Sequence, residues 1–190
     1  MPSEPVYVPT MSPGALMTAD ELRHEHLPHK RVELVRGVLV VREPPGFHHG
    51  EVVGRLAKLL IDHIDTHDLG RVVAGDTGFK LAANPDTVRG PDIAFVRRDR
   101  IPHPSPEGYA ELAPDLSVEV LSPNDRPGEV LAKVADWLSA GTSLVWVVDP
   151  TRRQVRAYRQ DGSESVIQAD DDLPGEHVLP GFSARLVAFL

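Results

Sequence analysis

Two of the most apolar segments of the chain each contain one acidic residue: Asp92 lies within residues 91–96 and Glu119 within residues 116–121. Both segments are rich in branched and aromatic residues, which are typical of buried β-strands. An ionised carboxylate in a buried strand is costly unless a cation or several hydrogen bonds compensate its charge. The fold must therefore place compensating groups beside both acids.

Side-chain alternation separates each acid from its apolar neighbours. Along the first segment, Ile93 points to the face opposite Asp92. Along the second, Val118 and Val120 point away from Glu119. If the two strands are neighbours, both carboxylates lie on one face of one sheet. Hard cations such as Mg²⁺ are held by one or two carboxylates, water and substrate phosphate, so the pattern predicts a metal site at these two acids.

The length and composition indicate one ordinary globular domain. With 190 residues the chain can build one hydrophobic core but is short for two. We expect an irregular, proline-rich arm over residues 1–17 and a single domain over residues 18–190. No segment has the roughly 20 apolar residues of a membrane-spanning helix, and there is no cysteine. The absence of cysteine excludes disulfides and thiol catalysis, and we expect a cytoplasmic protein rather than a membrane protein.

The charge of the chain limits how it can bind nucleic acid. The formal net charge is −8, which opposes broad, non-specific affinity for a polyanion. A small cleft with a few basic side chains and a metal ion can still hold phosphate. Any DNA binding is therefore expected in one local cleft.

The first half of the chain alternates between helical and strand patterns. A capping box that starts at Thr18 predicts a short helix that stops before Pro28. The two runs of residues 31–35 and 38–41 predict an N-terminal β-hairpin. Helical spacing over residues 52–64 predicts a long helix. Strands are then expected over residues 72–73, 79–81 and 92–96.

The second half predicts an αβ unit followed by a hairpin. A proline-rich loop over residues 97–114, either fully irregular or with one helical turn, leads to the strand that contains Glu119. A helix is expected over about residues 127–140, followed by a continuously apolar central strand over residues 144–148. A final hairpin is expected over residues 154–158 and 164–168. The fold class is therefore α/β (α+β), with a mixed central sheet flanked by helices.

Five blocks of the sequence occur in a fixed order: Gly90-Pro91-Asp92, residues 114–123, Lys133, Gly141 and residues 145–150. Together they resemble the Uma family of restriction-endonuclease-like proteins, a branch of the PD-(D/E)XK nuclease superfamily. The resemblance runs from about Leu22 to the C-terminus. It implies a restriction-endonuclease-like core and a metal-dependent endonuclease that hydrolyses DNA.

The resemblance also implies which residues hold the metal. Asp92 and Glu119 would bind Mg²⁺ or Mn²⁺, which polarises the phosphoryl oxygen and activates water. The alternatives are structural: Asp92 caps a turn after Pro91, and Glu119 pairs with a core arginine.

A basic side chain should assist the metal. In the superfamily a lysine lies two residues after the second acid, where this chain has Leu121. Lys133, on the following helix, is expected to take this role, and Lys80 is the second candidate. The alternative for Lys133 is an exposed ion pair with Glu129.

Glu33 and His49 complete the candidate site. Glu33 is either a third ligand or water-orienting acid, or an exposed position of the hairpin. His49 matches a family position ahead of the long helix, where it would hydrogen-bond a metal-bound water or the phosphate. His63 and His67 are expected on a solvated helix face, because no further ligands follow at zinc spacing.

Three functions remain open from the sequence. The first is a metal-dependent DNA endonuclease or nickase, expected to act as a homodimer because many such nucleases pair two active sites. The second is a catalytically weakened interaction module for nucleic acid or protein, in which Leu121 marks the loss of the catalytic lysine. The third is a hydrolase of small phosphate esters, which the acidic surface would tolerate better than long duplex DNA.

Overall fold

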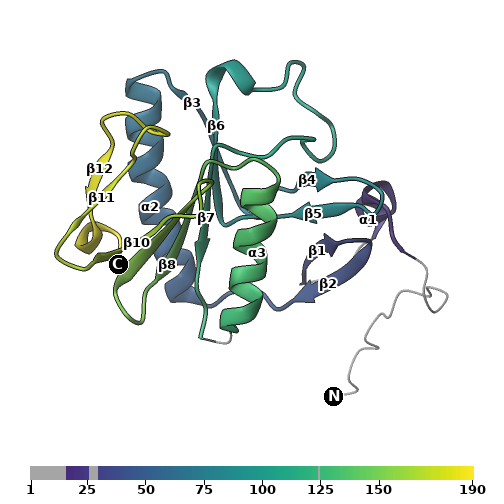
Figure 1. Cartoon of the computed structure of the whole chain (residues 1–190), viewed down its shortest axis with the longest axis horizontal. Helices are drawn as coiled ribbons and strands as arrows, with labels where there is room; N and C mark the ends of the chain where they lie inside the picture. The colour runs from purple at the N-terminus through teal and green to yellow at the C-terminus, as the bar shows by residue number, and fades with distance from the viewer. Residues whose placement is uncertain (1–15, 26–29, 124) are drawn as a thin grey trace.

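The computed structural model describes residues 16–25, 30–123 and 125–190. Its main element is a six-stranded mixed sheet with the order β10 (Glu164–Gln168), β9 (Gln154–Arg159), β8 (Leu144–Asp149), β7 (Leu116–Val120), β6 (Ile93–Arg97) and β3 (Gly70–Ala74). Beside it lies a four-stranded antiparallel sheet with the order β2 (Val38–Arg42), β1 (Arg31–Val35), β5 (Thr87–Arg89) and β4 (Phe79–Ala82) (Figure 1). The C-terminal region adds a ribbon of β11 (Asp172–Pro174) and β12 (Ser183–Arg185).

One long helix covers each face of the six-stranded sheet. In Figure 1, α2 (Phe47–Thr66) passes behind the sheet and α3 (Pro127–Ser139) lies in front of it. Trp146 of β8 packs in the apolar cluster that contains α2, whereas Val145 and Val147 pack in the cluster that contains α3. The apolar run of β8 is therefore buried on both faces, as expected for a central strand.

Helix α3 connects two parallel strands, β7 and β8. Its buried residues, Val134 and Trp137, face the sheet. The helix ends before Gly141, whose φ of +106° lies in the left-handed region that favours glycine. This crossover fixes α3 over the strand that contains Glu119.

The N-terminal hairpin joins the main sheet indirectly. It turns at Arg36 and Gly37, whose φ values of 50° and 76° suit a two-residue hairpin turn with positive φ at both positions. Strand β1 also pairs with β5 through Leu34 and Val88. Because residues 90–92 lead from β5 directly into β6, this pairing places β1 next to the start of β6.

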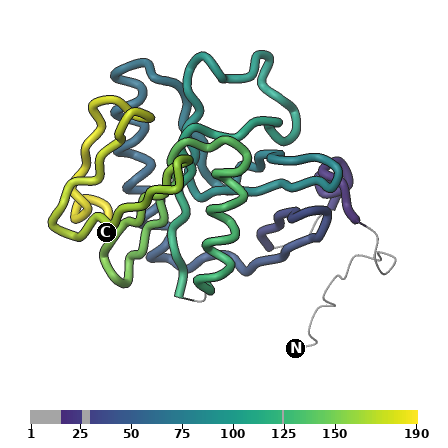
Figure 2. The backbone as a smooth tube through the Cα atoms, viewed as in Figure 1, coloured from purple at the N-terminus to yellow at the C-terminus, as the bar shows by residue number. Residues whose placement is uncertain are grey.

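The backbone trace also brings the hairpin beside α3 (Figure 2). Arg42, at the end of β2, places its Nη1 atom 3.3 Å from Oε2 of Glu129 on α3. These two residues are far apart in the sequence. Their contact links the end of β2 to the first turn of α3.

The observed elements confirm the expected fold class, a mixed sheet flanked by helices with an N-terminal hairpin. The capping box is present in α1 (Ala19–His24), where the Glu21 N–H donates to Thr18 Oγ1 and the Thr18 N–H donates to Glu21 Oε2. This helix ends at His24, before Pro28 as expected. Residues 26–29, and residues 1–15 of the expected arm, lie outside the described residues. Met17, the last residue of that arm, is buried.

The sequence did not predict strands β5, β11 and β12 or the short 3₁₀ helix η2 (Leu186–Ala188), whereas η1 (Arg98–Arg100) lies in the loop where one helical turn was considered. Each of these elements has only three residues, too few for a periodic pattern to appear. Asp92 lies directly before β6 rather than within it. Among the described residues, no helix is long and apolar enough to cross a membrane.

Candidate active site

Asp92 and Glu119 lie side by side at the junction of β6 and β7. The Asp92 N–H donates to the Val118 carbonyl over 3.1 Å, and the Val120 N–H donates to Asp92 Oδ2 over 2.7 Å. The antiparallel register pairs Ile93 with Val118. The Asp92 side chain therefore continues the hydrogen-bond ladder of the two strands and sits next to Glu119.

Both acids face the α3 layer. Val118 and Val120 pack in the cluster on the α2 side, so Glu119 points to the other face. There, Trp137 of α3 donates its indole N–H to Glu119 Oε1 over 2.8 Å. The expectation that Asp92 and Glu119 share one face of one sheet agrees with this geometry, and both residues are buried, with 5% and 7% of their surface exposed.

Lys133 of α3 points into the acid pair. Its Nζ atom lies 2.8 Å from Glu119 Oε2 and 3.0 Å from Glu33 Oε1, and it donates to the Gly90 carbonyl over 3.0 Å. The predicted alternative, an exposed pair with Glu129, is wrong because the Lys133 side chain is only 13% exposed. Four residues separate Lys133 from Trp137, so one face of α3 supplies both contacts to Glu119.

Glu33 is buried, so the exposed hairpin position considered from the sequence is wrong. Its Oε2 atom accepts from Arg89 Nη1 over 2.9 Å, and its Oε1 atom accepts from the Gly90 N–H over 3.0 Å. Arg89 also donates to Asp136 of α3 through Nε and Nη2. A buried ionic network thus ties β1, β5 and α3 together around Lys133.

His49 and Arg31 hold the other acid. His49, in the first turn of α2, places Nε2 3.3 Å from Asp92 Oδ2 and is 8% exposed. Arg31 of β1 donates Nη2 to Asp92 Oδ1 over 3.0 Å and also pairs with Asp76. Four elements therefore converge on Asp92: β1, α2, β6 and β7.

The environment drives the pKa values of the two central acids apart. Burial raises the pKa of Glu119 to about 7, since desolvation and the carboxylates of Asp92 and Glu33 outweigh the ion pair with Lys133. Burial also acts to raise the pKa of Asp92, but the hydrogen bond from His49, the Val120 N–H and the Arg31 charge outweigh it and leave the pKa lowered. Asp92 is therefore a carboxylate at neutral pH. In the absence of a metal ion, Glu119 is partly protonated at neutral pH.

The pKa values of the supporting charges favour their ionised forms. Burial lowers the pKa of Lys133, but the charges of Glu119, Glu33 and Asp92 outweigh this effect, so the net shift is upward. Burial likewise opposes ionisation of Glu33, yet Lys133 and Arg89 keep its pKa below the usual value. Lys133 and Glu33 thus form a buried pair of full charges.

These side chains open into one cleft of about 500 Å³. Its walls come from the hairpin, the start of α2, the loop after β7 and the first turns of α3. The lining includes the five residues predicted from the sequence, namely Asp92, Glu119, Lys133, Glu33 and His49. The structure therefore brings the whole predicted set together.

The charge of the cluster fits a divalent cation. Each of three cations is shared between two carboxylates: Arg31 by Asp76 and Asp92, Lys133 by Glu119 and Glu33, and Arg89 by Glu33 and Asp136. With all five carboxylates ionised, as they would be around a bound metal ion, and histidine counted as neutral, five carboxylates against three cations leave two negative charges. Arg36 lies 3.9 Å from Asp136, but its side chain is 76% exposed and screened by water.

The donor set fits a hydrated ion rather than a closed cage. Within the described ranges, no three His, Asp or Glu side chains are arranged around a common metal position. Mg²⁺ rarely needs such a cage, because it keeps several waters and binds through one or two carboxylates. On these grounds Asp92 and Glu119 could hold Mg²⁺ or Mn²⁺.

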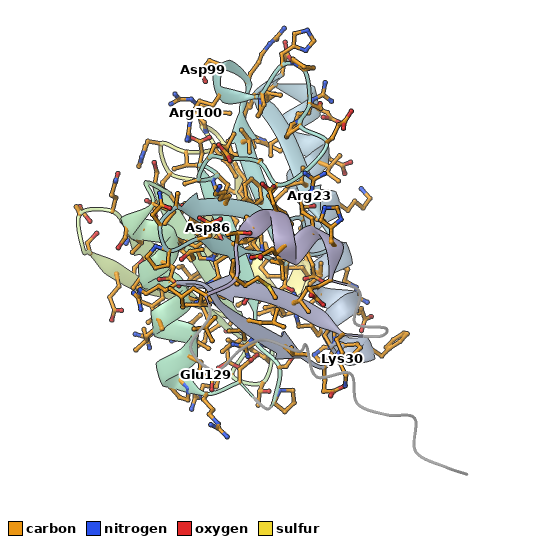
Figure 3. All side chains as sticks on the ribbon, turned by 90° about the vertical axis from the view of Figure 1, so that its right-hand side faces the viewer. Arg23, Lys30, Asp86, Asp99, Arg100 and Glu129 are labelled. Atoms are coloured by element: carbon orange, nitrogen blue, oxygen red, sulfur yellow. The ribbon has the colours of Figure 1, made fainter. Side chains whose placement is uncertain are left out.

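Three residues considered from the sequence lie elsewhere. Lys80 pairs with Glu111 and Asp86, over 3.3 and 3.6 Å, and does not line the cleft. Figure 3 shows Asp86 well separated from Glu129, which marks the mouth of the cleft. His67 is exposed as expected, whereas His63 is half-buried against Phe182, with Nε2 3.1 Å from the Pro180 carbonyl.

Sequence reasoning missed three residues that support the site: Arg31, Arg89 and the indole of Trp137. Trp137 carried a usable signal, because it lies four residues after Lys133 and so on the same helix face. The two arginines carried none, because their partners come from distant segments of the chain.

Comparisons with known proteins show the family and the fold of the chain. Residues 20–188 match the Uma2 family, described as "Putative restriction endonuclease". The chain belongs to the Uma2 family. This membership confirms the resemblance seen in the sequence and covers every element that builds the cleft. The comparison with curated proteins found no match to the chain.

A solved structure shows the same fold. It is the crystal structure of a protein from Anabaena variabilis ATCC 29413, described as a "putative nuclease belonging to DUF820". The TM-score is 0.79 at 20% sequence identity, with 91% of this chain and 97% of that chain covered. The Uma2 chain thus has a nuclease-like fold over nearly its whole length.

Proposed function

We propose that this Uma2 protein is a metal-dependent endonuclease that hydrolyses phosphodiester bonds in DNA. The observation that carries the proposal is the convergence of two buried carboxylates and a buried lysine in one open cleft. Groups that are expensive to bury and lie in an accessible cleft are typical of catalytic sites. Asp92 and Glu119 would hold Mg²⁺ or Mn²⁺.

The bound ion would polarise the phosphoryl oxygen and lower the pKa of the attacking water. Lys133 would supply the positive charge of the superfamily's lysine, because this chain has Leu121 at that lysine's position. Its ammonium lies 2.8 Å from Glu119, so it can orient the water and stabilise the charge that develops on the phosphate. Leu121 packs with the apolar residues under α3 instead.

Glu33 and His49 act as positioning residues in this proposal. Glu33 already accepts from Lys133, Arg89 and the Gly90 N–H, so its role is to aim Lys133 rather than to bind the ion. His49 holds Asp92 Oδ2 in place. Both residues keep the reactive groups in a fixed geometry, which lowers the reorganisation needed in the reaction.

The cleft is proposed to take one DNA strand at a time. One cleft of about 500 Å³ holds the scissile region of a strand, so cutting both strands calls for a second copy of the site. We therefore propose a homodimer, with the two sites related by two-fold symmetry.

The test is cleavage of supercoiled plasmid in Mg²⁺, in Mn²⁺ and in EDTA. Nicked or linear product that requires a metal and is lost in Asp92→Asn supports the endonuclease. Asp99→Asn is the matched control, because Asp99 is exposed and far from the cleft (Figure 3). Hydrolysis of an aryl phosphate ester but not plasmid would favour the small-ester hydrolase. No hydrolysis of either substrate, with metal bound, would favour the interaction module.

A further inference from the structure

The N-terminus of α2 carries free backbone donors. The helix has 20 residues, its N-cap is Gly46, and no side chain caps it. The backbone N–H groups of Phe47, His48 and His49 have no acceptor in the part of the chain that the structure describes. No acidic residue lies in the first turn. Three free donors and the positive end of the helix dipole therefore point the same way.

Two residues of this helix end, Gly46 and His49, line the cleft that contains Asp92 and Glu119. Pro44 and Pro45 line the same cleft. The ring of His49 contacts Asp92 through Nε2, so the helix end lies one side chain away from the proposed metal site.

His49 supplies a second observation that points to a ligand. The residue is 8% exposed, and its Nδ1 atom is buried without a hydrogen-bond partner among the described residues. A buried polar atom left unpaired is costly and rare, and it commonly marks the place of a ligand or an ordered water. Here the unpaired atom belongs to the same helical turn as the free N–H groups.

We propose that the N-terminus of α2 binds a phosphate group of the substrate strand next to the phosphate that reacts at Asp92 and Glu119. The N–H groups of residues 47–49 would donate to the phosphate oxygens. Because Nε2 of His49 donates to Asp92, Nδ1 is an acceptor, and a water of the phosphate's hydration shell would donate to it. This inference rests on the proposed function, because it assigns a substrate subsite beside the same catalytic centre.

Position 46 offers a matched pair of variants. Gly46 has a φ of −76°, and a Cβ atom there would meet nothing within 4 Å, so other residues fit without strain. Gly46→Asp and Gly46→Asn both cap the helix with a side-chain oxygen. Only aspartate places a negative charge where the phosphate would lie. The comparison therefore separates electrostatic exclusion from helix capping.

The first measurement uses inorganic phosphate without any metal. Thermal unfolding is followed in EDTA with phosphate or chloride at equal ionic strength. Phosphate stabilises many proteins non-specifically, so the Gly46→Asp variant provides the baseline. We expect phosphate to raise the Tm of the native chain more than that of Gly46→Asp, with Gly46→Asn in between. Equal shifts in all three proteins would overturn the inference.

The second measurement is the concentration dependence of plasmid or oligonucleotide cleavage. Gly46→Asp should raise KM at least about tenfold with little change in kcat, while Gly46→Asn should change KM much less. An unchanged KM in Gly46→Asp would contradict the subsite. If the native chain cleaves no DNA but the phosphate shift depends on residue 46, the subsite stands and only the proposed function fails.

Discussion

At the scale of single residues, the site contains cations that each form ion pairs with two carboxylates. Lys133 holds Glu119 and Glu33, and Arg89 holds Glu33 and Asp136. Removing one partner of a buried pair leaves an uncompensated charge, which typically costs about 3–5 kcal/mol. The effects of substitutions on folding and on chemistry must therefore be measured separately.

Replacing Lys133 with methionine tests its chemical role. We expect Lys133→Met to lower turnover by about 10²-fold or more, while the affinity for Mn²⁺ stays unchanged or increases, because the ammonium competes with the ion for Glu119. The checks are cleavage rates at saturating metal and a metal titration, with the fold verified by circular dichroism. A loss of metal affinity as large as the loss of turnover would assign Lys133 to ion binding instead.

Glu119 should make stability depend on pH when no metal is present. Its pKa is about 7 in the folded chain, against 4.5 as the ordinary value. The folded state therefore binds the proton more tightly, and the free energy of unfolding falls as the pH rises from about 4.5 to about 7, by about 3 kcal/mol at most. Above that window the contribution is constant. Asp92 and Glu33 have lowered pKa values, so their contributions are lost only at more acidic pH.

Urea unfolding at several pH values in EDTA measures this dependence. The Glu119→Gln variant cannot titrate at this position, so it should lack the decline between about pH 4.5 and 7. The rest of the sequence is the same in both proteins, so the difference between the two profiles is assigned to Glu119. Identical pH profiles for the native chain and the variant would show that the pKa of Glu119 is not raised.

At the scale of elements, Arg89 connects β5 with β1 and α3. Its side chain is 5% exposed and reaches Glu33 on one side and Asp136 on the other. The four-stranded sheet and α3 are thereby held at a fixed distance around Lys133. The position of Lys133 therefore depends on a residue from a three-residue strand.

Arg89→Met should destabilise the fold by about 3 kcal/mol, because it leaves Glu33 and Asp136 without their shared cation. Arg97→Met is the matched control: its ion pair with Asp99 is more than half exposed on both sides, and such pairs contribute less than about 1 kcal/mol. Chemical denaturation of the two variants provides the comparison. Equal losses would show that the buried network does not hold the elements together.

The elements differ in how far the sequence predicts them. Long periodic segments such as α2 and α3 were predicted, and alternation placed both acids on one face. The burial of Glu33 was not predictable, because it follows from the pairing of Leu34 with Val88 on a short strand with no periodicity of its own. The role of Arg89 depends on the same long-range contact. Lys133 was predicted because it is one of the five blocks that carry the family resemblance and lies on the helix that follows the Glu119 strand.

At the scale of the whole molecule, the negative net charge of the chain opposes the binding of DNA in the cleft. The net charge is −8, and the cluster in the cleft is itself negative until a cation enters. A bound metal ion should therefore strengthen DNA binding, as well as supply the chemistry. The same balance predicts that only a few phosphates are contacted.

DNA affinity should accordingly fall as salt increases, with a slope that reports the small number of contacted phosphates. Fluorescence anisotropy with a labelled duplex at several salt concentrations, with Ca²⁺ present, measures this slope. An affinity that does not respond to salt, or no binding at all with the metal present, would favour the small-ester or interaction-module functions.

The most direct test of the central claim is calorimetric titration with Mn²⁺. The native chain and the Asp99→Asn control should bind the ion, whereas Asp92→Asn and Glu119→Gln should each lose at least about tenfold in affinity while remaining folded. Unchanged Mn²⁺ affinity in both site variants would contradict the assignment of Asp92 and Glu119 as the metal-binding pair.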